Sequence, residues 1–327
     1  MNESSRTGDD GLGAPGEPVP PGAPVPAVSE IAVVILTYRQ MSLTLRCLRH
    51  LLHSEPDGTA FRILLWDNGS HDDTAQAVRR EFPTVHVHVS ETNLGVAGGR
   101  NAAAAEALRL WDPRFLLFLD NDMVVETGFV TSLWKPFLVP SGARVGQTQA
   151  KLRLAEDPDR LNDGGGCRIQ FWLGRTRPVG YGEVDRGQYD TPARCVSCGG
   201  AMMVRSALFR ALGGFDEVFN PFGPEDLDFS LRLQEAGWES WYVPQAMAFH
   251  DVTHTFGGGE YSEEYAAHRS RHWLKFMRRH ARIRDWIGFV FVGAPVIAAR
   301  VIGREVGRGN IGALRGLLRG LLGRPQK

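Results

Sequence analysis

The chain has 327 residues, of which 43% are hydrophobic, and its 37 basic residues balance its 37 acidic residues. This composition is typical of a globular protein with a sizeable core, and the zero net charge gives no electrostatic reason to expect nucleic-acid binding. The N-terminus lacks the features of a secretory signal, and no stretch reaches the roughly 18 consecutive apolar residues typical of a spanning helix. The sequence therefore favours a cytoplasmic protein with one large α/β domain and tails.

The first 29 residues and the cysteines are less informative. Residues 1–29 are rich in Gly and Pro and poor in large apolar residues, which predicts a disordered leader. Cys195 and Cys198 form one CxxC pair with Cys167 upstream, but a zinc site would need a fourth ligand. We therefore expect reduced, packed cysteines, with a zinc site as the alternative.

Strands and helices are predicted to alternate from residue 31 onward. Short runs of apolar residues indicate buried strands, and apolar residues at helical spacing indicate helices. The predicted order is strand 31–36, helix 41–53, strand 61–66, helix 72–82, strand 85–89, helix 101–110 and strand 115–119. This repeated alternation predicts an α/β fold with a doubly wound, mostly parallel sheet.

The predicted strands end in polar or small residues, and the carboxyl ends of such strands share one rim. Asp67 ends the second strand and could accept hydrogen bonds from a nucleobase edge or a ribose. After the third strand come Gly95, Gly98 and Gly99, followed by Arg100 at the predicted start of a helix. Backbone donors and the guanidinium could cradle a diphosphate there. The alternative is that the glycines only make a tight turn.

Two carboxylates, Asp120 and Asp122, follow the fourth strand. In an extended chain residues i and i+2 point the same way, so these side chains could share a target. Clustered acids cost free energy unless a cation or donors satisfy them, and a hard divalent cation that also binds phosphate would do so. The alternative is a solvated turn after a strand.

The second half of the chain is less regular, with a loop-rich or hairpin region over 141–190 and a small-residue strand over 196–204. An acidic run of Glu225, Asp226 and Asp228 then falls at the start of an amphipathic helix. Capping and the helix dipole explain one or two acidic residues at a helix start. They explain all three less well, so a functional role for this run is the other interpretation.

Two histidines follow a further apolar run. His250 ends that run directly, and His254 lies four residues later. Either could be the neutral nitrogen ligand of a metal held by carboxylates, and His250 is favoured by its position.

The C-terminal part of the sequence is basic. A helix with a basic face is predicted over 262–280, and residues 281–327 contain nine Lys or Arg against two acids. A basic amphipathic tail suits the surface of an anionic membrane. The alternative is a helix that packs on the core or mediates dimerisation.

Taken in order, these motifs resemble family 2 glycosyltransferases with the GT-A fold, particularly bacterial rhamnosyl- and galactofuranosyltransferases. The resemblance covers roughly residues 30–255 and rests on the motifs VVILTY, DNGS, NLGVAGGRN, DND, GGAMMVR, GGFDEVF and PFGPEDLDFSLRL. It implies a GT-A domain over 30–280, with a nucleotide-binding half and an acceptor-binding half, between the leader and the 281–327 tail.

The resemblance also implies a role for each motif. Mg²⁺ or Mn²⁺ would be bound by Asp120, Asp122 and His250, and the Glu225–Asp226 pair would be catalytic, with Asp226 as the base. The nucleotide sugar would be bound by Thr37, Tyr38, Asp67, Gly98, Arg100, Asp120 and Gly200.

The implied activity is metal-dependent transfer of a sugar, with inversion, from a UDP-, dTDP- or GDP-linked donor to a hydroxyl of a glycan or lipid-linked saccharide. Such an enzyme would work in the cytoplasm, peripherally at the inner face of the membrane. Two alternatives are a nucleotidyltransferase acting on a sugar phosphate and a non-catalytic, membrane-associated binding module.

Overall fold

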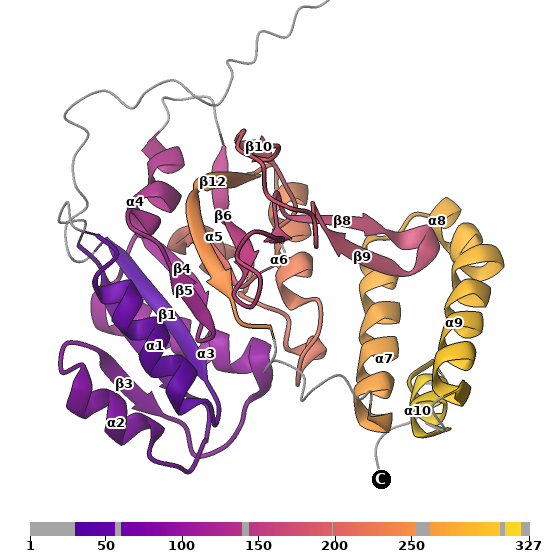
Figure 1. Cartoon of the computed structure of the whole chain (residues 1–327), viewed down its shortest axis with the longest axis horizontal. Helices are drawn as coiled ribbons and strands as arrows, with labels where there is room; N and C mark the ends of the chain where they lie inside the picture. The colour runs from indigo at the N-terminus through magenta and orange to yellow at the C-terminus, as the bar shows by residue number, and fades with distance from the viewer. Residues whose placement is uncertain are drawn as a thin grey trace, which may run out of the picture.

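The computed structural model describes residues 30–55, 60–138, 144–197, 199–252, 262–307 and 311–321. The expectations for the 1–29 leader, for Cys198 and for His254 lie outside the described residues. One large sheet organises the chain (Figure 1). Its strand order is β10 (Ala193–Arg194), β12 (Glu239–His250), β6 (Val145–Leu154), β11 (Ala201–Arg205), β4 (Phe115–Asp120), β1 (Ile31–Thr37), β2 (Arg62–Asp67) and β3 (His86–Val89), with β5 (Met123–Val125) on β12 and β7 (Leu161–Asp163) on β6.

The N-terminal half confirms the predicted parallel sheet. Strands β4, β1, β2 and β3 are parallel neighbours, connected in part by helices α1 (Met41–Leu52), α2 (Thr74–Glu81) and α3 (Gly95–Trp111). Alternate residues of β1 enter two separate hydrophobic clusters, one on each face of the sheet, which explains its uninterrupted apolar sequence. The register pairs Thr37 with Asp67 and Leu36 with Asp120, so the strand ends meet at one rim.

The C-terminal half of the sheet contains a long strand that the sequence reading missed. Strand β6 lies inside the region expected to be loop-rich, and it pairs with β11 and β12. Its side chains Gln147, Thr148, Gln149 and Lys151 are polar but buried, so the strand lacks an apolar signature. The buried charge of Lys151 is neutralised by Asp185 and Asp190, each of which has a carboxylate oxygen 2.6 Å from the ammonium group.

The strand predicted over 196–204 is shorter in the structure. Strand β11 begins only at Ala201, because Gly199 and Gly200 adopt φ values of +80° and +76° that break the extended backbone. Helices α4 (Phe129–Trp134), α5 (Ser206–Ala211) and α6 (Glu225–Glu235) and the 3₁₀ turns η1 (Lys135–Leu138) and η3 (Glu217–Phe219) complete this half.

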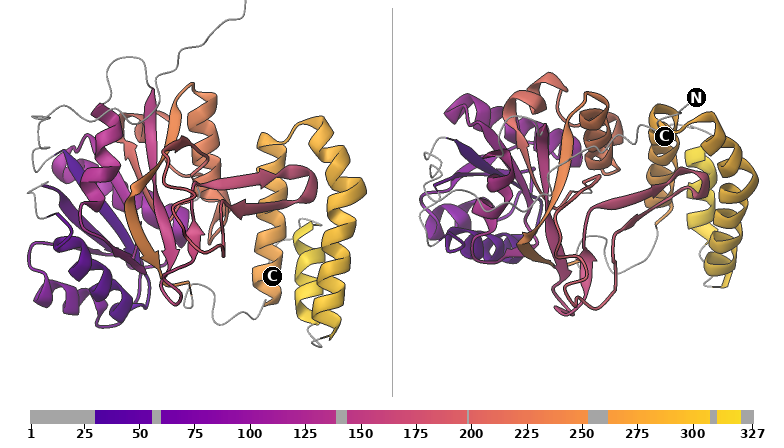
Figure 2. Two further views of the ribbon diagram at one scale, coloured as in Figure 1. Left: turned by 45° about the horizontal axis from the view of Figure 1, so that its top comes forward. Right: turned by 90° about the horizontal axis from the view of Figure 1, so that it is seen from above.

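A hairpin reaches from the sheet toward a separate layer of C-terminal helices (Figures 1 and 2). It consists of β8 (Cys167–Gln170) and β9 (Arg175–Pro178), with the turn η2 (Phe171–Leu173) at its tip. The layer contains α7 (Glu263–His280), α8 (Ile283–Gly288), a π turn η5 (Phe289–Gly293), α9 (Ala294–Gly307) and α10 (Ile311–Leu321). None of the described helices is both long and apolar enough to cross a bilayer.

Helix α7 is fixed to the sheet domain by a third hydrophobic cluster. Phe276 of α7 is fully buried there with Cys167 of β8, Phe219 and Leu227. Cys167 and Cys195 are buried free thiols, and burial raises the pKa of Cys195 to about 12.

Candidate active site

Arg100 joins three segments that are distant in the sequence. Its Nη1 donates to Glu225 Oε1 at 3.1 Å, and its Nη2 donates to Asp120 Oδ1 at 2.5 Å. Its side chain is only 10% exposed. Burial disfavours the guanidinium charge, but Asp120, Glu225 and Asp226 outweigh it and raise the pKa of Arg100. A buried, permanently charged arginine therefore holds the acidic residues at one rim of the sheet.

Glu225 and Asp226 begin helix α6 but have different surroundings. Glu225 is buried, and its second oxygen accepts from the Gly223 amide at 3.1 Å, so both oxygens are engaged. Asp226 is half-buried and accepts from the Leu227 amide at 2.7 Å. Burial raises the pKa of both carboxyls, against the charge of Arg100, and the charge of Asp226 adds to the rise at Glu225. Of the pair, Asp226 is therefore the more exposed carboxylate, and Glu225 is the one with both oxygens engaged.

Two glycines lie between these carboxylates. A Cβ on Gly199 would lie 2.2 Å from Asp226 Oδ2, and a Cβ on Gly200 would lie 3.9 Å from Asp120 Oδ2 and 2.7 Å from Met123. The Gly200 carbonyl also accepts from the Asp120 amide at 2.8 Å. The glycine pair thus connects the end of β4 to the start of α6.

Replacing Gly199 by Ala is expected to displace the Asp226 carboxylate and to reduce activity strongly. Gly213→Ala is the matched control, because Gly213 also has a positive φ, +73°, but no heavy atom within 4 Å of an added Cβ. Both substitutions incur about 1–2 kcal/mol of backbone strain, and only Gly199→Ala adds the clash. Equal losses of activity in the two variants, measured at matched folded fractions, would contradict this role for Gly199.

Asp120 and Asp122 bind different side chains here, although both charges act on His250, so a shared target for the two carboxylates stays a prediction. Strand β4 ends at Asp120, and a turn at 121–122 precedes β5. Asp120 faces Arg100, whereas Asp122 is buried with its Oδ2 3.4 Å from His250 Nε2. The turn redirects the second carboxylate toward the end of β12.

The Asp122–His250 pair has the chemistry of a partial metal site. His250 Nδ1 lies 3.1 Å from Asn162 Oδ1, and an amide oxygen only accepts, so Nδ1 carries the proton and Nε2 faces Asp122. Burial lowers the pKa of His250, but the hydrogen bond and charge of Asp122 outweigh it and the pKa is raised. Within the described ranges, no three His, Cys, Asp or Glu side chains converge as a complete cage. A cation bound mainly by substrate phosphates and water needs only one or two protein ligands, so the pair fits Mg²⁺ or Mn²⁺.

The glycine-rich segment does not form the expected diphosphate cradle. Helix α3 begins at Gly95, so Gly98 and Gly99 are helical and Arg100 lies in the second turn. The Ala97 and Gly98 amides donate to Asn220 Oδ1, at 3.1 and 3.3 Å, and the Val96 amide donates to the Pro221 carbonyl. The helix N-terminus is therefore capped by the chain itself. Gly98 serves close packing on Asn220, which an added Cβ would approach within 3.1 Å.

The residues expected to contact the nucleoside differ in accessibility. Thr37 is buried, and its hydroxyl shares a 2.8 Å hydrogen bond with Thr44, so its side chain anchors the strand end rather than lining a pocket. Asp67 is also buried and accepts from the Ser70 amide at 2.9 Å, which shapes the DNGS turn. Tyr38 is 38% exposed, with the Arg39 guanidinium 5.0 Å from its ring centroid.

Asp228, the third acid of the run, has a structural role that the sequence reading left open. It is fully buried and binds Arg232 of its own helix and Arg279 and His280 of α7, at 2.7–2.9 Å. These hydrogen bonds lower its pKa although burial opposes the charge. Asp228 thereby fixes α7 against the helix that carries Asp226.

An α/β sheet whose strand ends gather acidic residues beside a buried arginine, with a carboxylate–histidine pair next to them, is a ligand site at the carboxyl ends of the strands. A family model described as "Glycosyltransferase like family 2" matches residues 26–281. The chain therefore belongs to glycosyltransferase family 2 and is a glycosyltransferase, which confirms the resemblance seen in its motifs.

Two curated relatives illustrate the range of the family. The chain is 29% identical over 225 residues to N-acetylglucosaminyl-diphospho-decaprenol L-rhamnosyltransferase of Mycobacterium tuberculosis, covering 64% of this chain and 72% of the relative. It is 26% identical over 232 residues to an N-acetylglucosaminyltransferase of Azorhizobium caulinodans, covering 68% of this chain and 55% of the relative.

Solved structures agree on the fold. GalNAc-T7, crystallised with UDP, GalNAc and Mn²⁺, superposes with a TM-score of 0.61 at 16% identity over 76% of this chain and 47% of its own. The mannosyltransferase PcManGT from Pyrobaculum calidifontis, in complex with GDP-Man and Mn²⁺, gives 0.54 at 14% identity over 90% and 88%. At these identities the likeness establishes the fold alone.

Proposed function

We propose that the protein is a metal-dependent, inverting glycosyltransferase that moves a sugar from a nucleotide-sugar donor to a hydroxyl of a glycan or lipid-linked saccharide. The observation that carries this proposal is that Arg100 binds both Glu225 and Asp120 beside the glycine pair, with the charge of Asp226 also acting on Arg100. It provides one half-buried carboxylate with a raised pKa at a rim that also holds cation-binding groups.

Asp122 and His250 would hold Mg²⁺ or Mn²⁺ together with phosphate oxygens of the donor. A cation bound there supplies charge neutralisation for the departing nucleoside diphosphate. Both solved neighbours named above contain Mn²⁺ and a nucleotide or nucleotide sugar, which supports this choice of cofactor and donor. Asp120 keeps Arg100 oriented, and Arg100 adds positive charge near the donor.

Asp226 acts as the general base. Its carboxylate removes the proton from the acceptor hydroxyl as the oxygen attacks the anomeric carbon and the bond to the diphosphate breaks. A single displacement from the opposite face inverts the configuration and needs no protein nucleophile. Glu225 positions the base through Arg100 and the Gly223 amide.

A screen of nucleotide sugars tests the proposed function. We expect a UDP-, dTDP- or GDP-sugar to raise the unfolding temperature in the presence of Mn²⁺, because a ligand that binds only the folded state stabilises it. Turnover should release the nucleoside diphosphate and should stop on chelation and resume with added Mn²⁺. Release of pyrophosphate from a nucleoside triphosphate would instead identify a nucleotidyltransferase.

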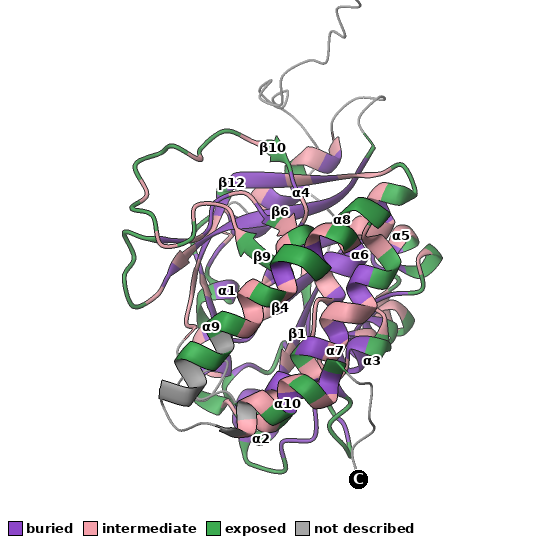
Figure 3. Cartoon of the chain, turned by 90° about the vertical axis from the view of Figure 1, so that its right-hand side faces the viewer, coloured by how far each residue is buried: buried purple, intermediate pink, exposed green. Residues whose placement is uncertain are grey.

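We also propose that the C-terminal helices bind an anionic membrane surface. Ile283, Ile287 and Phe291 recur every four residues, and they are 81%, 56% and 76% exposed. Ile283 and Ile287 belong to α8 and Phe291 to η5, and Figure 3 colours much of α8 and of α9 as exposed. The exposed Arg284 directly follows Ile283, and apolar side chains next to an arginine suit a lipid interface. A lipid-linked acceptor, as in the name of the mycobacterial relative, is consistent with such a surface.

Introducing Ile287→Asp together with Phe291→Asp is expected to reduce co-sedimentation with phosphatidylglycerol-containing vesicles at least tenfold. Burying each apolar side chain contributes about 1.5–3 kcal/mol, which the two aspartates remove. Tyr181→Asp is the control, because Tyr181 is 46% exposed on the sheet domain. Unchanged sedimentation of the double variant would contradict the membrane proposal. It would not bear on the proposed transferase function.

A further inference from the structure

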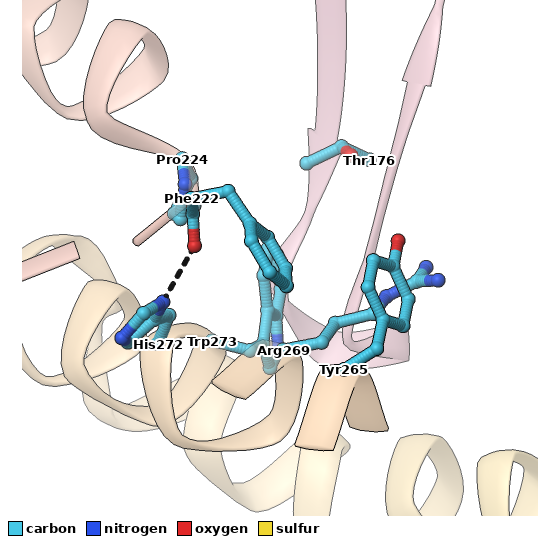
Figure 4. Close-up of a pocket in the computed structure, with 8 residues that line it drawn as sticks. Thr176, Phe222, Pro224, Tyr265, Arg269, His272 and Trp273 are labelled. Atoms are coloured by element: carbon cyan, nitrogen blue, oxygen red, sulfur yellow. Dashed lines mark hydrogen bonds between the residues drawn. The ribbon is translucent and has the colours of Figure 1, made fainter. Parts of the chain in front are cut away.

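The two acidic motifs of the site are held by different parts of the chain. The loop before helix α6 is fixed by α7, since His272 Nδ1 donates to the Phe222 carbonyl at 2.8 Å, beside a cavity of about 230 Å³ (Figure 4). Neither acid of the catalytic pair lines that cavity. The turn that contains Asp120 and Asp122 is held instead from β1 and α1, through the residue between the two acids, Asn121.

Asn121 is buried although it lies in a turn between two charged residues, with only 7% of its surface exposed. Its Nδ2 donates to the Thr44 hydroxyl at 3.0 Å and to the Thr37 hydroxyl at 3.3 Å. Thr37 is the last residue of β1, Thr44 lies in the first turn of α1, and both are buried. The side chain thus joins the turn after β4 to two elements from the start of the domain.

The hydrogen-bonding capacity of Thr44 sets the direction of these hydrogen bonds. Its hydroxyl donates its one proton to the Gln40 carbonyl at 2.8 Å, so it can only accept from Thr37 and Asn121. Thr37 therefore donates to Thr44 at 2.8 Å and accepts from Asn121. The amide nitrogen of Asn121, and not its oxygen, faces both hydroxyls. An aspartate of the same shape has no proton to donate at neutral pH, so the network specifies an amide at this position.

This anchor determines where the two neighbouring carboxylates point. In a continued strand residues 120 and 122 would face the same side, where their like charges would repel each other. In the turn, Asp120 forms a salt bridge with Arg100, and Asp122 Oδ2 lies 3.4 Å from His250 Nε2. The side chain between the two acids is therefore the one that fixes the conformation on which both directions depend.

We infer that Asn121 is a positioning residue for the divalent cation. Held by the hydroxyls of Thr37 and Thr44, it fixes the turn so that the Asp122 carboxylate lies beside His250 before the cation and the donor bind. This inference rests on the proposed function and adds to it three residues that act on the cation through its ligand. Groups that orient metal ligands in this way typically change metal affinity by about 10–100-fold.

Direct titration of Mn²⁺ tests the inference without requiring turnover. We would measure free Mn²⁺ by electron paramagnetic resonance, using the full-length chain with the best-binding nucleoside diphosphate present. Thr44→Val removes the hydroxyl and keeps the shape of the side chain, and it is expected to weaken Mn²⁺ binding about tenfold. Thr44→Ser keeps the hydroxyl that accepts from Asn121, and its Mn²⁺ affinity should stay within about twofold of the wild type.

Thr148→Val separates this effect from the general loss of a buried hydroxyl. Thr148 is as fully buried as Thr44 and donates to the Leu133 carbonyl at 2.9 Å. It lies on β6, which is not a neighbour of β4 or β1 in the sheet. This variant should lower the urea midpoint of unfolding to a similar extent and leave the Mn²⁺ affinity unchanged. Equal losses of Mn²⁺ affinity in the two valine variants would overturn the inference, as would failure of the wild-type chain to bind Mn²⁺.

Combining two substitutions shows whether Asn121 and Thr44 act as one unit. Asn121→Ala alone should weaken Mn²⁺ binding at least as much as Thr44→Val, because it removes the whole anchor. Adding Thr44→Val to Asn121→Ala should then cause little further loss, since residues of one network are not additive. Fully additive losses of Mn²⁺ affinity would overturn the inference.

The inference and the proposed function fail in distinguishable ways. Mn²⁺ binding that depends on Asn121 and Thr44, without nucleoside diphosphate release from any donor, would support the positioning role and reject the transferase. Turnover with wild-type Mn²⁺ affinity in both Asn121→Ala and Thr44→Val would keep the transferase and reject the positioning role.

Discussion

Substituting Asn for Asp226 is expected to lower kcat by about 10²–10⁴-fold, the usual contribution of a general base, with donor affinity nearly unchanged. Asparagine keeps the size of the side chain and can still accept from the Leu227 amide, but it cannot take a proton at neutral pH. Initial rates and the Kd of the nucleotide sugar, measured on the same preparations, separate the two effects.

Glu235→Gln is the matched control for this experiment, because this substitution removes the same charge from the far end of the same helix. The Glu235 side chain is 63% exposed there. Its rate should stay within about twofold of the wild type, since exposed ion pairs contribute little. A near-normal rate in Asp226→Asn would reject Asp226 as the base and reopen the role of Glu225.

The pH dependence of the wild-type enzyme follows from the same carboxylate. Burial raises the pKa of Asp226, and only the ionised form accepts a proton, so kcat/KM should fall as pH falls through that raised pKa. The acid limb is therefore expected well above the ordinary aspartate pKa of about 3.9. It should be missing from the residual activity of Asp226→Asn. An acid limb at the ordinary value would contradict the buried environment of Asp226.

Much of the fold could be predicted from the sequence because hydrophobic patterning is local. Strand β1 and its parallel neighbours are short apolar runs that end in polar residues, and the structure places them as predicted. Strand β6 could not be found this way, because polar side chains such as Lys151 are buried against partners such as Asp185, which lies 31 positions after the strand ends. Helix α3 extends into a glycine-rich segment because Asn220, far along the chain, caps it.

In the candidate site, too, the sequence predicted which residues are present but not which of them bind each other. The sequence indicated which residues carry charge, including Arg100, Asp120 and Glu225, but not that one arginine would bind both acids. It also suggested a shared target for Asp120 and Asp122, but not that a turn after β4 would direct them to different side chains, Arg100 and His250. The Phe222–Tyr265 stack, which joins two distant segments, left no local signal at all.

Arg100→Met is expected to destabilise the protein by about 3–5 kcal/mol, because it leaves buried carboxylates without their partner. Methionine fills much of the same volume, so the loss reports mainly on charge. The comparison is Arg114→Met, since Arg114 is 66% exposed and pairs with Glu30 at 3.1 Å. That variant should lose less than about 1 kcal/mol. Urea denaturation of the three proteins gives the free energies of unfolding, and similar losses in both variants would contradict a central role for Arg100.

A double-mutant cycle shows whether the loss comes from the Arg100–Glu225 contact. In a Glu225→Gln background the carboxylate that Arg100 neutralises is already uncharged, so Arg100→Met should cost less there than in the wild type. The remaining cost then reports on Asp120, which Arg100 still binds. An unchanged loss of unfolding free energy in the Glu225→Gln background would mean that Arg100 and Glu225 contribute independently. The glycine pair would then have to connect the end of β4 to helix α6.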